Sequence, residues 1–303
     1  MTQNIFIGVD GGGTKSKVRV ENEAGELLGQ ALGGPANIRL STKKSWESIH
    51  HALQQVLHDA GLALEDQRYH YHIGLGLAGC EVIEAVNEFL SATHPFKTIQ
   101  LTSDAHVACV GAHQSENGSI IIVGTGTIGY QVENGKGVRV GGWGFPHDDE
   151  GSGAWLGLEA ARNTFQWLDH RAEKSPLVED IFAFFDNDTE KFASWANSAN
   201  SSEFGRLAPL VINHAQQEEI AAVRLMKKAA HAVDRINSAL LKLQTHPEKP
   251  LPCCLFGGIA PFLEPWLSED LRSRIVPRRA DANVGAILMI RDIVAMKSKK
   301  KCY

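Results

Sequence analysis

The 303-residue sequence lacks the features that mark secreted, membrane and nucleic-acid-binding proteins. Residues 1–4 have neither the basic nor the apolar segment of a signal peptide. No uninterrupted apolar run approaches the roughly 20 residues that a membrane-spanning helix needs. The formal net charge is -5, which speaks against a nucleic-acid partner. These absences predict a cytoplasmic protein with no membrane or nucleic-acid partner.

Cysteine is also scarce, and its spacing does not indicate a metal site. The sequence has five cysteines and no C-x-x-C pair. Cys253 and Cys254 are adjacent in an apolar run, so a strand would direct them to opposite faces, where buried thiols are expected. The five are Cys80, Cys109, Cys253, Cys254 and Cys302.

Glycine, by contrast, is concentrated in residues 10–15, which read Asp-Gly-Gly-Gly-Thr-Lys between the apolar run 5–9 and the alternating segment 18–20. Successive glycines permit φ > 0 and let main-chain N–H groups point at an anion, which predicts a phosphate site in a β-hairpin. Asp10 at its mouth would repel phosphate unless a divalent cation lay between them, as Mg²⁺ would. The spacing fits neither a Walker A loop nor a Rossmann fingerprint. A glycine-rich turn with a solvated aspartate is the alternative.

A second copy of the pattern favours the phosphate site. The apolar run 119–123 leads into Gly124-Thr125-Gly126-Thr127, and a strand-like segment and a polar turn follow, as in the first copy. Chance similarity of two hairpins is the alternative to a duplicated chain whose halves hold a polyphosphate from both sides. A third run, 252–256, opens into Gly257-Gly258, where a flat adenosine could approach the main chain.

The order of these motifs resembles the sugar kinase, Hsp70 and actin superfamily, and within it the branch that holds N-acetylglucosamine and glucosamine kinases and the BadF-type ATPases. The resemblance implies an α/β fold of two RNase H-like (actin-like ATPase) domains with a nucleotide and sugar cleft between them. It extends over nearly the whole chain and is carried by residues 34–38, 76–79, 103–105, 124–127, 141–144, 149–153 and 257–258.

The resemblance implies ATP and Mg²⁺ as cofactors and assigns their contacts. Asp10 would hold the metal ion. The nucleotide would contact Gly12, Gly13, Thr14, Lys15, Gly124, Thr125, Gly126 and Thr127 through its phosphates, and Gly257 and Gly258 through its adenosine.

Asp104 is the candidate catalytic residue. Phosphoryl transfer to an alcohol needs a group that accepts the hydroxyl proton, and a carboxylate near the phosphates suits that role. Ser103 and Asp104 also precede an apolar run, so an ordinary helix N-cap is the alternative. The resemblance places Asp104 among the substrate contacts, together with Asn37, Gly142 and Asp149.

The segment 147–150 reads His-Asp-Asp-Glu, but four consecutive ligands cannot all face one metal ion. A sugar offers hydroxyls that pair well with carboxylates. Asp148 is the alternative sugar contact to Asp149 if the register differs by one residue.

The expected domains are 1–113 and 114–303, with the last helix packing back on the first domain. Apolar spacing predicts a helix over 46–58, the longest helix from 220 to 240 and a final helix from 281 to 295, followed by a frayed tail over 297–303.

The predicted function is ATP-dependent phosphorylation of N-acetylglucosamine or glucosamine, at the 6-hydroxyl. Two alternatives remain open. One is a BadF-type activator or switch without sugar phosphorylation, although no iron–sulfur spacing is evident. The other is a silent sugar-binding regulator, although the first strand begins too early for an added DNA-binding helix pair. A homodimer is an open possibility, and the partner expected is a small-molecule amino sugar.

Overall fold

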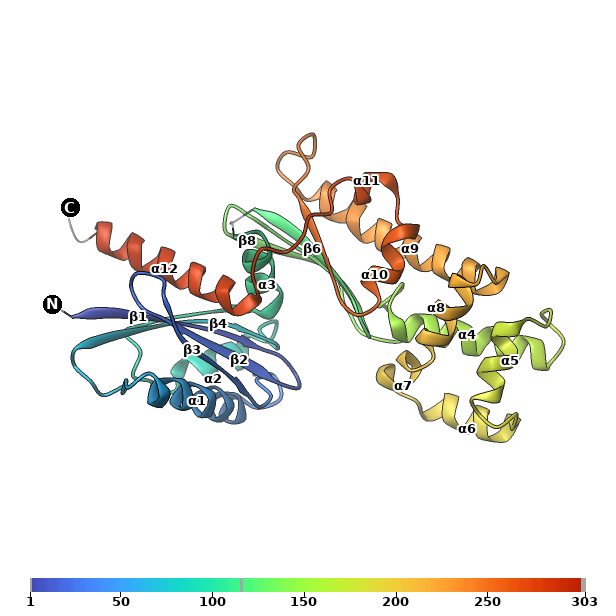
Figure 1. Cartoon of the computed structure of the whole chain (residues 1–303), viewed down its shortest axis with the longest axis horizontal. Helices are drawn as coiled ribbons and strands as arrows, with labels where there is room; N and C mark the ends of the chain where they lie inside the picture. The colour runs from blue at the N-terminus through green and yellow to red at the C-terminus, as the bar shows by residue number, and fades with distance from the viewer. Residues whose placement is uncertain (1, 115–116, 301–303) are drawn as a thin grey trace. The chain divides into compact units, whose positions relative to one another are not determined.

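The computed structural model describes residues 2–114 and 117–300, and it divides into two compact units (Figure 1). Unit 1 comprises Met1–Gly118, Val132–Gly137 and Pro277–Tyr303, and unit 2 comprises Ser119–Gln131 and Val138–Val276. Each unit is built around its own β-sheet.

Unit 1 contains a five-stranded sheet in the order β3-β2-β1-β4-β5. The first three strands form an antiparallel meander, whereas β4 runs parallel to β1 and β5 parallel to β4. This topology is that of an RNase H-like domain. The strands are β1 (Gln3–Gly11), β2 (Ser16–Glu21), β3 (Leu27–Gly33), β4 (Tyr69–Leu77) and β5 (Thr98–Ser103).

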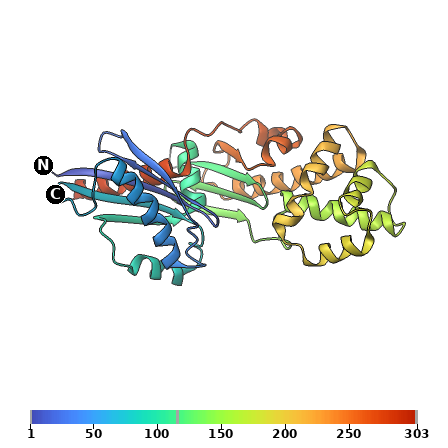
Figure 2. The same ribbon diagram turned by 60° about the horizontal axis from the view of Figure 1, so that its bottom comes forward.

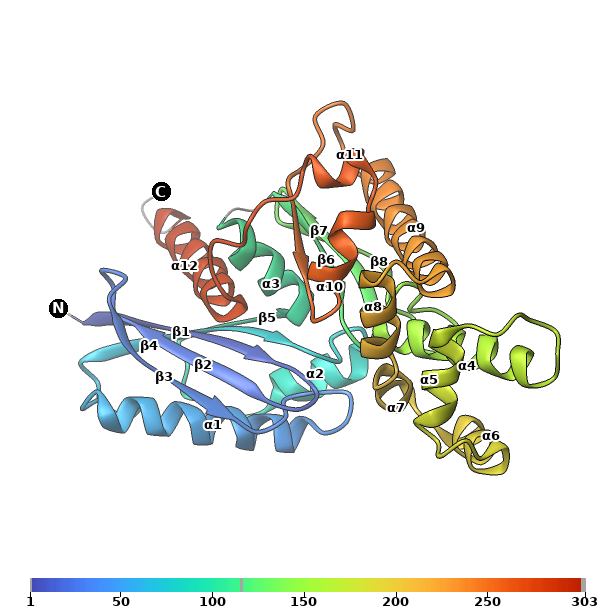
Figure 3. The ribbon, with the colours of Figure 1, turned by 45° about the vertical axis from the view of Figure 1, so that its right-hand side comes forward.

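Helices cover both faces of this sheet, with α1 and α2 on one face and α3 and α12 on the other (Figure 3). In α1, Ile49, Leu53 and Val56 form the buried stripe that the apolar spacing predicts. On the other face, a Cβ atom at Gly8 would lie 2.0 Å from the Asn283 oxygen, so only glycine lets α12 pack this closely. The four helices are α1 (Thr42–Asp59), α2 (Ile83–Ser91), α3 (Asp104–His113) and α12 (Ala282–Lys300).

The final helix packs on elements of the first half of the sequence. Gly285 approaches the main chain of Val107 in α3 so closely that a Cβ atom would lie 2.0 Å from the Val107 oxygen. The predicted end at residue 295 is too early, because α12 continues to Lys300, so residues 297–300 are not a frayed tail. The remainder of that predicted tail, with Cys302, lies outside the described residues.

Unit 2 repeats the strand plan of unit 1. Its sheet has the order β8-β7-β6-β9, which corresponds to β3-β2-β1-β4, and β9 runs parallel to β6 as β4 does to β1. A parallel bridge from Cys253 to Ile275 stands where β5 would pair with β4. The same strand order in both units supports the predicted duplication. The strands are β6 (Gly118–Val123), β7 (Thr127–Glu133), β8 (Lys136–Gly141) and β9 (Cys253–Phe256), of which residue 118 and the hairpin end 132–137 are grouped with unit 1.

The units differ in the connection before the fourth strand. Unit 1 places α1 there, whereas unit 2 inserts a cluster of six helices, yellow-green to orange in Figure 2. Among the described residues, no helix is both long and apolar enough to cross a membrane. The helices of unit 2 are α4 (Gly153–Leu168), α5 (Pro176–Ala183), α6 (Thr189–Ser198), α7 (Ser201–Gly205), α8 (Ala208–Gln216), α9 (Ile220–Lys242), α10 (Ala260–Leu263), the short 3₁₀ helix η1 (Glu264–Trp266) and α11 (Glu269–Arg272).

Candidate active site

The hairpin predicted from the first glycine run is confirmed. β1 and β2 pair in antiparallel register with Asp10 opposite Lys17, and the turn between them is closed by a bond from Gly12 N–H to the Lys15 oxygen at 3.0 Å. Ala36 N–H donates to the Gly12 oxygen at 2.9 Å and fixes the turn from outside. The turn is therefore held by main-chain bonds, and its side chains are left for other contacts.

The glycines of this turn are not required for the reason predicted from the sequence, which was a positive φ. None of Gly11, Gly12 and Gly13 has a positive φ, so left-handed backbone is not what requires them. Gly11 is needed for packing, because a Cβ atom there would lie 2.5 Å from the Leu77 side chain. A Cβ at Gly13 would meet no atom within 4 Å. Open space at Gly12 and Gly13 lets a ligand reach the main chain.

Asp10 is a half-buried carboxylate among other charges. Its pKa rises to about 6, first because burial disfavours the charged form and then because Asp104 and Asp281 repel it; Lys17 and Lys15 oppose the rise. A hard divalent cation beside Asp10 would offset this repulsion, because such cations prefer oxygen ligands. Asp281 is far from Asp10 in the sequence, so local patterns could not predict that the two carboxylates lie near each other.

Asp104 is the first residue of α3, and the capping role falls to its neighbour. Ser103 accepts a hydrogen bond from His106 N–H at 3.2 Å and is the N-cap. Asp104 Oδ1 accepts from Ala105 N–H at 2.8 Å. Burial raises the pKa of Asp104, and Glu81 raises it further, against the lowering by the Ala105 bond. A helix N-terminus thus holds a half-buried carboxylate whose proton affinity is increased, as a proton acceptor requires.

Asn37 lies in a bridge with Ala78, beside the end of β4. Its Oδ1 accepts from Arg39 N–H at 3.1 Å. A Cβ atom at Gly79 would lie 2.7 Å from the same oxygen, and Gly79 has a φ of 91°. Asn37 is therefore held firmly in unit 1.

The second predicted hairpin is also confirmed, and it is held by Asp149. Gly124 N–H donates to the Gly126 oxygen at 2.9 Å, which closes the turn between β6 and β7. Asp149 Oδ1 accepts from Thr127 N–H at 3.0 Å, and the Asp149 backbone is left-handed with a φ of 66°. Burial is the main cause that raises the pKa of Asp149. In this structure one oxygen of Asp149 is committed to the turn.

The neighbouring Asp148 holds a different loop. Its Oδ2 accepts from Trp143 N–H at 2.9 Å. The exposed Trp143 ring lies under the Arg139 guanidinium at 4.3 Å, and Gly142 before it has a φ of 73°. Asp148 and Asp149 therefore support two separate turns.

A cavity of about 220 Å³ lies beside these turns in unit 2. Thr127 Oγ1 is buried there and finds no hydrogen-bond partner among the described residues. Glu150 on the cavity wall pairs with Arg235 of α9, and no motif in the sequence pointed to Arg235. The lining consists of Thr127, Val140, Gly141, Trp143, Asp148, Glu150, Ala232, Arg235 and Ile236.

The third glycine pair lies against the second turn. Gly257 has a φ of 98°, and a Cβ atom there would lie 2.1 Å from the Val123 oxygen and 2.9 Å from Gly124 N. Ile259 N–H donates to the same Val123 oxygen at 3.1 Å. A Cβ at Gly258 would meet no atom within 4 Å, so its surface is open. Unit 2 thus brings the second and third glycine motifs together.

The predicted residues therefore fall into two groups. Unit 1 brings Asp10 and Asp104 close enough to interact electrostatically. Unit 2 brings Gly124, Thr127 and Asp149 around one turn. Within residues 2–114 and 117–300, no group of three or more His, Cys, Asp or Glu side chains is arranged to hold a metal ion, so Mg²⁺ would need oxygens from its nucleotide and from water as well.

Two sheets with the same strand plan and a glycine turn after each first strand define an α/β protein of two actin-like domains. The fold agrees with that of a ROK hexokinase from Thermus thermophilus, which has a TM-score of 0.59 and 18% identity and covers 96% of this chain and 99% of that one. The chain belongs to the BadF/BadG/BcrA/BcrD ATPase family, whose model matches residues 7–289.

Two more similar proteins carry sugar-kinase names. Glucosamine kinase GspK of Vibrio cholerae is 35% identical over 285 residues, which cover 94% of this chain and 95% of that protein. A crystal structure of a candidate N-acetylglucosamine kinase from Chromobacterium violaceum has a TM-score of 0.80 and 35% identity, and covers 94% of this chain and 98% of that one.

Proposed function

We propose that this protein is an ATP-dependent amino-sugar kinase that phosphorylates glucosamine or N-acetylglucosamine at the 6-hydroxyl. The observation that carries the proposal is the pair of half-buried, electrostatically coupled carboxylates in unit 1, Asp10 and Asp104, next to an open glycine turn. The family and the names of two relatives at 35% identity support it. An enzyme of this kind would act in the cytoplasm, where ATP is available.

Asp104 is the proposed catalytic residue. As the 6-oxygen forms its bond to the γ-phosphorus, the bond from that phosphorus to the β–γ bridging oxygen breaks and ADP leaves. The hydroxyl proton passes to Asp104, whose raised pKa makes it a better acceptor than an exposed aspartate. Asn37, Gly142 and Asp149 are the proposed sugar contacts.

The nucleotide is assigned to the glycine turns. Thr14 and Lys15, with the open main chain of Gly12 and Gly13, would bind phosphate oxygens in unit 1. In unit 2 the corresponding group is Gly124, Thr125, Gly126 and Thr127, with Gly257 and Gly258 on the adenosine. Thr127 Oγ1, which is buried without a partner among the described residues, fits a donor to a phosphate oxygen.

Asp10 is the proposed Mg²⁺ contact, direct or through water. A bound Mg²⁺ would neutralise phosphate charge that develops during transfer. Asp10→Ala is expected to lower turnover most at low Mg²⁺, with partial recovery at high Mg²⁺. An unchanged Mg²⁺ dependence would mean that Asp10 only shapes the turn.

The deciding experiment is a coupled ADP-release assay over hexoses, glucosamine, N-acetylglucosamine and N-acetylmuramic acid. We expect one amino sugar to stimulate ADP release well above the sugar-free rate and to yield a 6-phosphate detected by mass spectrometry. ADP release that no sugar stimulates would favour the activator or switch. Sugar binding without ADP release would favour the silent regulator.

A further inference from the structure

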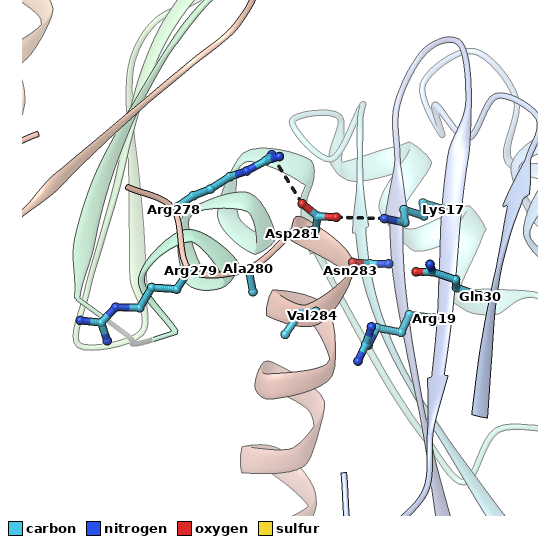
Figure 4. Close-up of a pocket in the computed structure, with 9 residues that line it drawn as sticks. All are labelled: Lys17, Arg19, Gln30, Arg278, Arg279, Ala280, Asp281, Asn283 and Val284. Carbon is cyan, nitrogen blue, oxygen red and sulfur yellow. Dashed lines mark hydrogen bonds and ion pairs between the residues drawn. The ribbon is translucent and has the colours of Figure 1, made fainter. Parts of the chain in front are cut away.

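A cavity of about 280 Å³ lies in unit 1 at the start of α12 (Figure 4). None of the turn residues 12–15 lines it. At about 30 Å³ for each water molecule, the cavity has room for about nine waters. That volume suits a phosphate group that carries a small substituent, and it is too small for a whole nucleotide. The lining residues are Lys17, Arg19, Gln30, Arg278, Arg279, Ala280, Asp281, Asn283 and Val284.

Asn283 gives the first indication of a ligand. The residue is only 1% exposed, and its Nδ2 donor finds no hydrogen-bond partner among the described residues. Figure 4 shows its amide directed toward the strands that carry Lys17 and Gln30. Leaving an amide donor unsatisfied in the interior is unfavourable, so an acceptor in the cavity would remove that penalty.

The main chain around Asn283 adds further donors. α12 is 19 residues long and begins at Ala282. Val284 and Gly285 donate to the Asp281 oxygen, whereas the N–H groups of Ala282 and Asn283 precede any acceptor that the helix can provide. The positive end of the helix dipole lies at the same place, and such an end favours an anion.

Cationic side chains surround the same space. Lys17 and Arg19 come from β2, and Arg278 comes from the segment before α12. Asp281 lies between two of them, 2.9 Å from Lys17 Nζ and 3.5 Å from Arg278 Nη1. Arg19 also pairs with Glu21 at 2.7 Å.

Arg279 differs from these cations, because its side chain extends away from the group in Figure 4. The remaining three cations exceed the single lining carboxylate, so the cavity as a whole favours an anion.

We propose that this cavity is a binding site for a phosphate group, separate from the two glycine turns. The group would accept from Asn283 Nδ2 and from the first amides of α12, and would pair with Lys17 and Arg19. Its source is either inorganic phosphate or the phosphomonoester of a small metabolite. The site is additional to the proposed kinase site and borders it, because Lys17 and Asp281 also act electrostatically on Asp10.

The test is calorimetric titration of the full chain with inorganic phosphate and, separately, with a hexose 6-phosphate. Each titration is done with and without saturating Mg²⁺ and a non-hydrolysable ATP analogue. We expect at least one of the two ligands to bind with and without the analogue, and the one that binds identifies the source. Absence of binding overturns the proposal, and so does complete displacement by the ATP analogue, because the anion would then occupy the nucleotide site.

Variants locate the binding. Asn283→Asp replaces the donor with a carboxylate of the same size and is expected to weaken phosphate binding at least about tenfold. Arg278→Gln, at the exposed rim, should weaken it several-fold without unfolding the protein. Lys43→Gln is the matched control, because Lys43 is an exposed cation of unit 1 outside the cavity, with 86% side-chain exposure.

If Asn283→Asp fails to fold, Arg19→Gln takes its place. Wild-type phosphate affinity in both Arg19→Gln and Arg278→Gln would overturn the assignment to this cavity.

Discussion

The turn after β1 and the turn after β6 occupy the same place in two sheets of the same strand order, but they differ in charge. The first turn is flanked by Asp10, whose pKa is raised by burial and by two other carboxylates. The second has no charged residue between Gly124 and Thr127, and its nearest carboxylate, Asp149, holds the turn by a main-chain bond. A duplicated hairpin can therefore keep its geometry while one copy provides charged chemistry and the other provides main-chain and hydroxyl donors.

We expect the largest effect on activity from the carboxylates near the turn after β1. Asp104→Asn keeps the shape of the side chain and removes the proton acceptor, so kcat for the amino sugar should fall roughly 10² to 10⁴ fold. The ADP-release assay measures kcat, and calorimetry checks that sugar and nucleotide still bind. Near wild-type kcat would remove Asp104 from the mechanism.

In the absence of Mg²⁺, we expect the charge of Asp10 to make the stability of the protein depend on pH. Between about pH 4 and pH 6 the folded protein binds a proton at Asp10 that the unfolded chain has lost, so stability falls as pH rises through this window. Above about pH 7 the loss is nearly complete and amounts to about 3 kcal/mol. Asp10→Asn should therefore stabilise the protein at pH 8 by up to this amount, and by less at pH 5.

Urea unfolding at the two pH values measures this difference. Asp292→Asn is the control, because Asp292 is an exposed carboxylate of α12. Equal stabilisation of the Asp10 variant at both pH values would contradict the explanation.

Substitutions of Asp149 test the turn after β6, which has no charged residue of its own. Asn can accept from Thr127 N–H and tolerates the left-handed φ of 66°, whereas Ala provides neither. Asp149→Ala should lower stability by about 1 to 3 kcal/mol and raise the KM for ATP, while Asp149→Asn should be close to wild type in stability. A large rise in sugar KM in Asp149→Asn, with unchanged stability, would assign the charge itself to the sugar.

The smallest effects should come from two matching helix caps. Ser103 caps α3 in unit 1 and Ser152 caps α4 in unit 2, each by accepting a main-chain hydrogen bond, from His106 and Trp155 respectively. Substitution by Ala should lower stability by about 1 kcal/mol in each case. Ser103→Ala should also lower kcat modestly, because Asp104 is the next residue; equal kcat in both variants would show that the cap does not position Asp104.

The parts of the site that were predicted well are those encoded by neighbouring residues. The two hairpins and the strand-to-helix position of Asp104 follow from apolar runs interrupted by glycine or serine. What could not be predicted were the partners of these residues. The bond from Thr127 to Asp149 joins residues 22 apart, and nothing in the local pattern distinguishes Asp149 from Asp148.

The glycine run also shows that a motif can be predicted correctly for the wrong physical reason. Its residues are glycine, but their φ values are not positive. Gly11 is required by the Leu77 side chain, which belongs to β4 and approaches only when the sheet has formed.

The sequence by itself determined the order of strands and turns, the duplication and the chemical types at each turn, because strand alternation and turn preferences depend on residues that are close in the chain. Only the tertiary structure decided which charges meet. Lys17 and Asp281 pair across 264 residues because α12 returns to the sheet of unit 1, and this return also buries Asn283 beside β1. Burial and electrostatic neighbours depend on such long-range packing, so the raised pKa of Asp10 and the phosphate cavity at α12 become visible only in the folded chain.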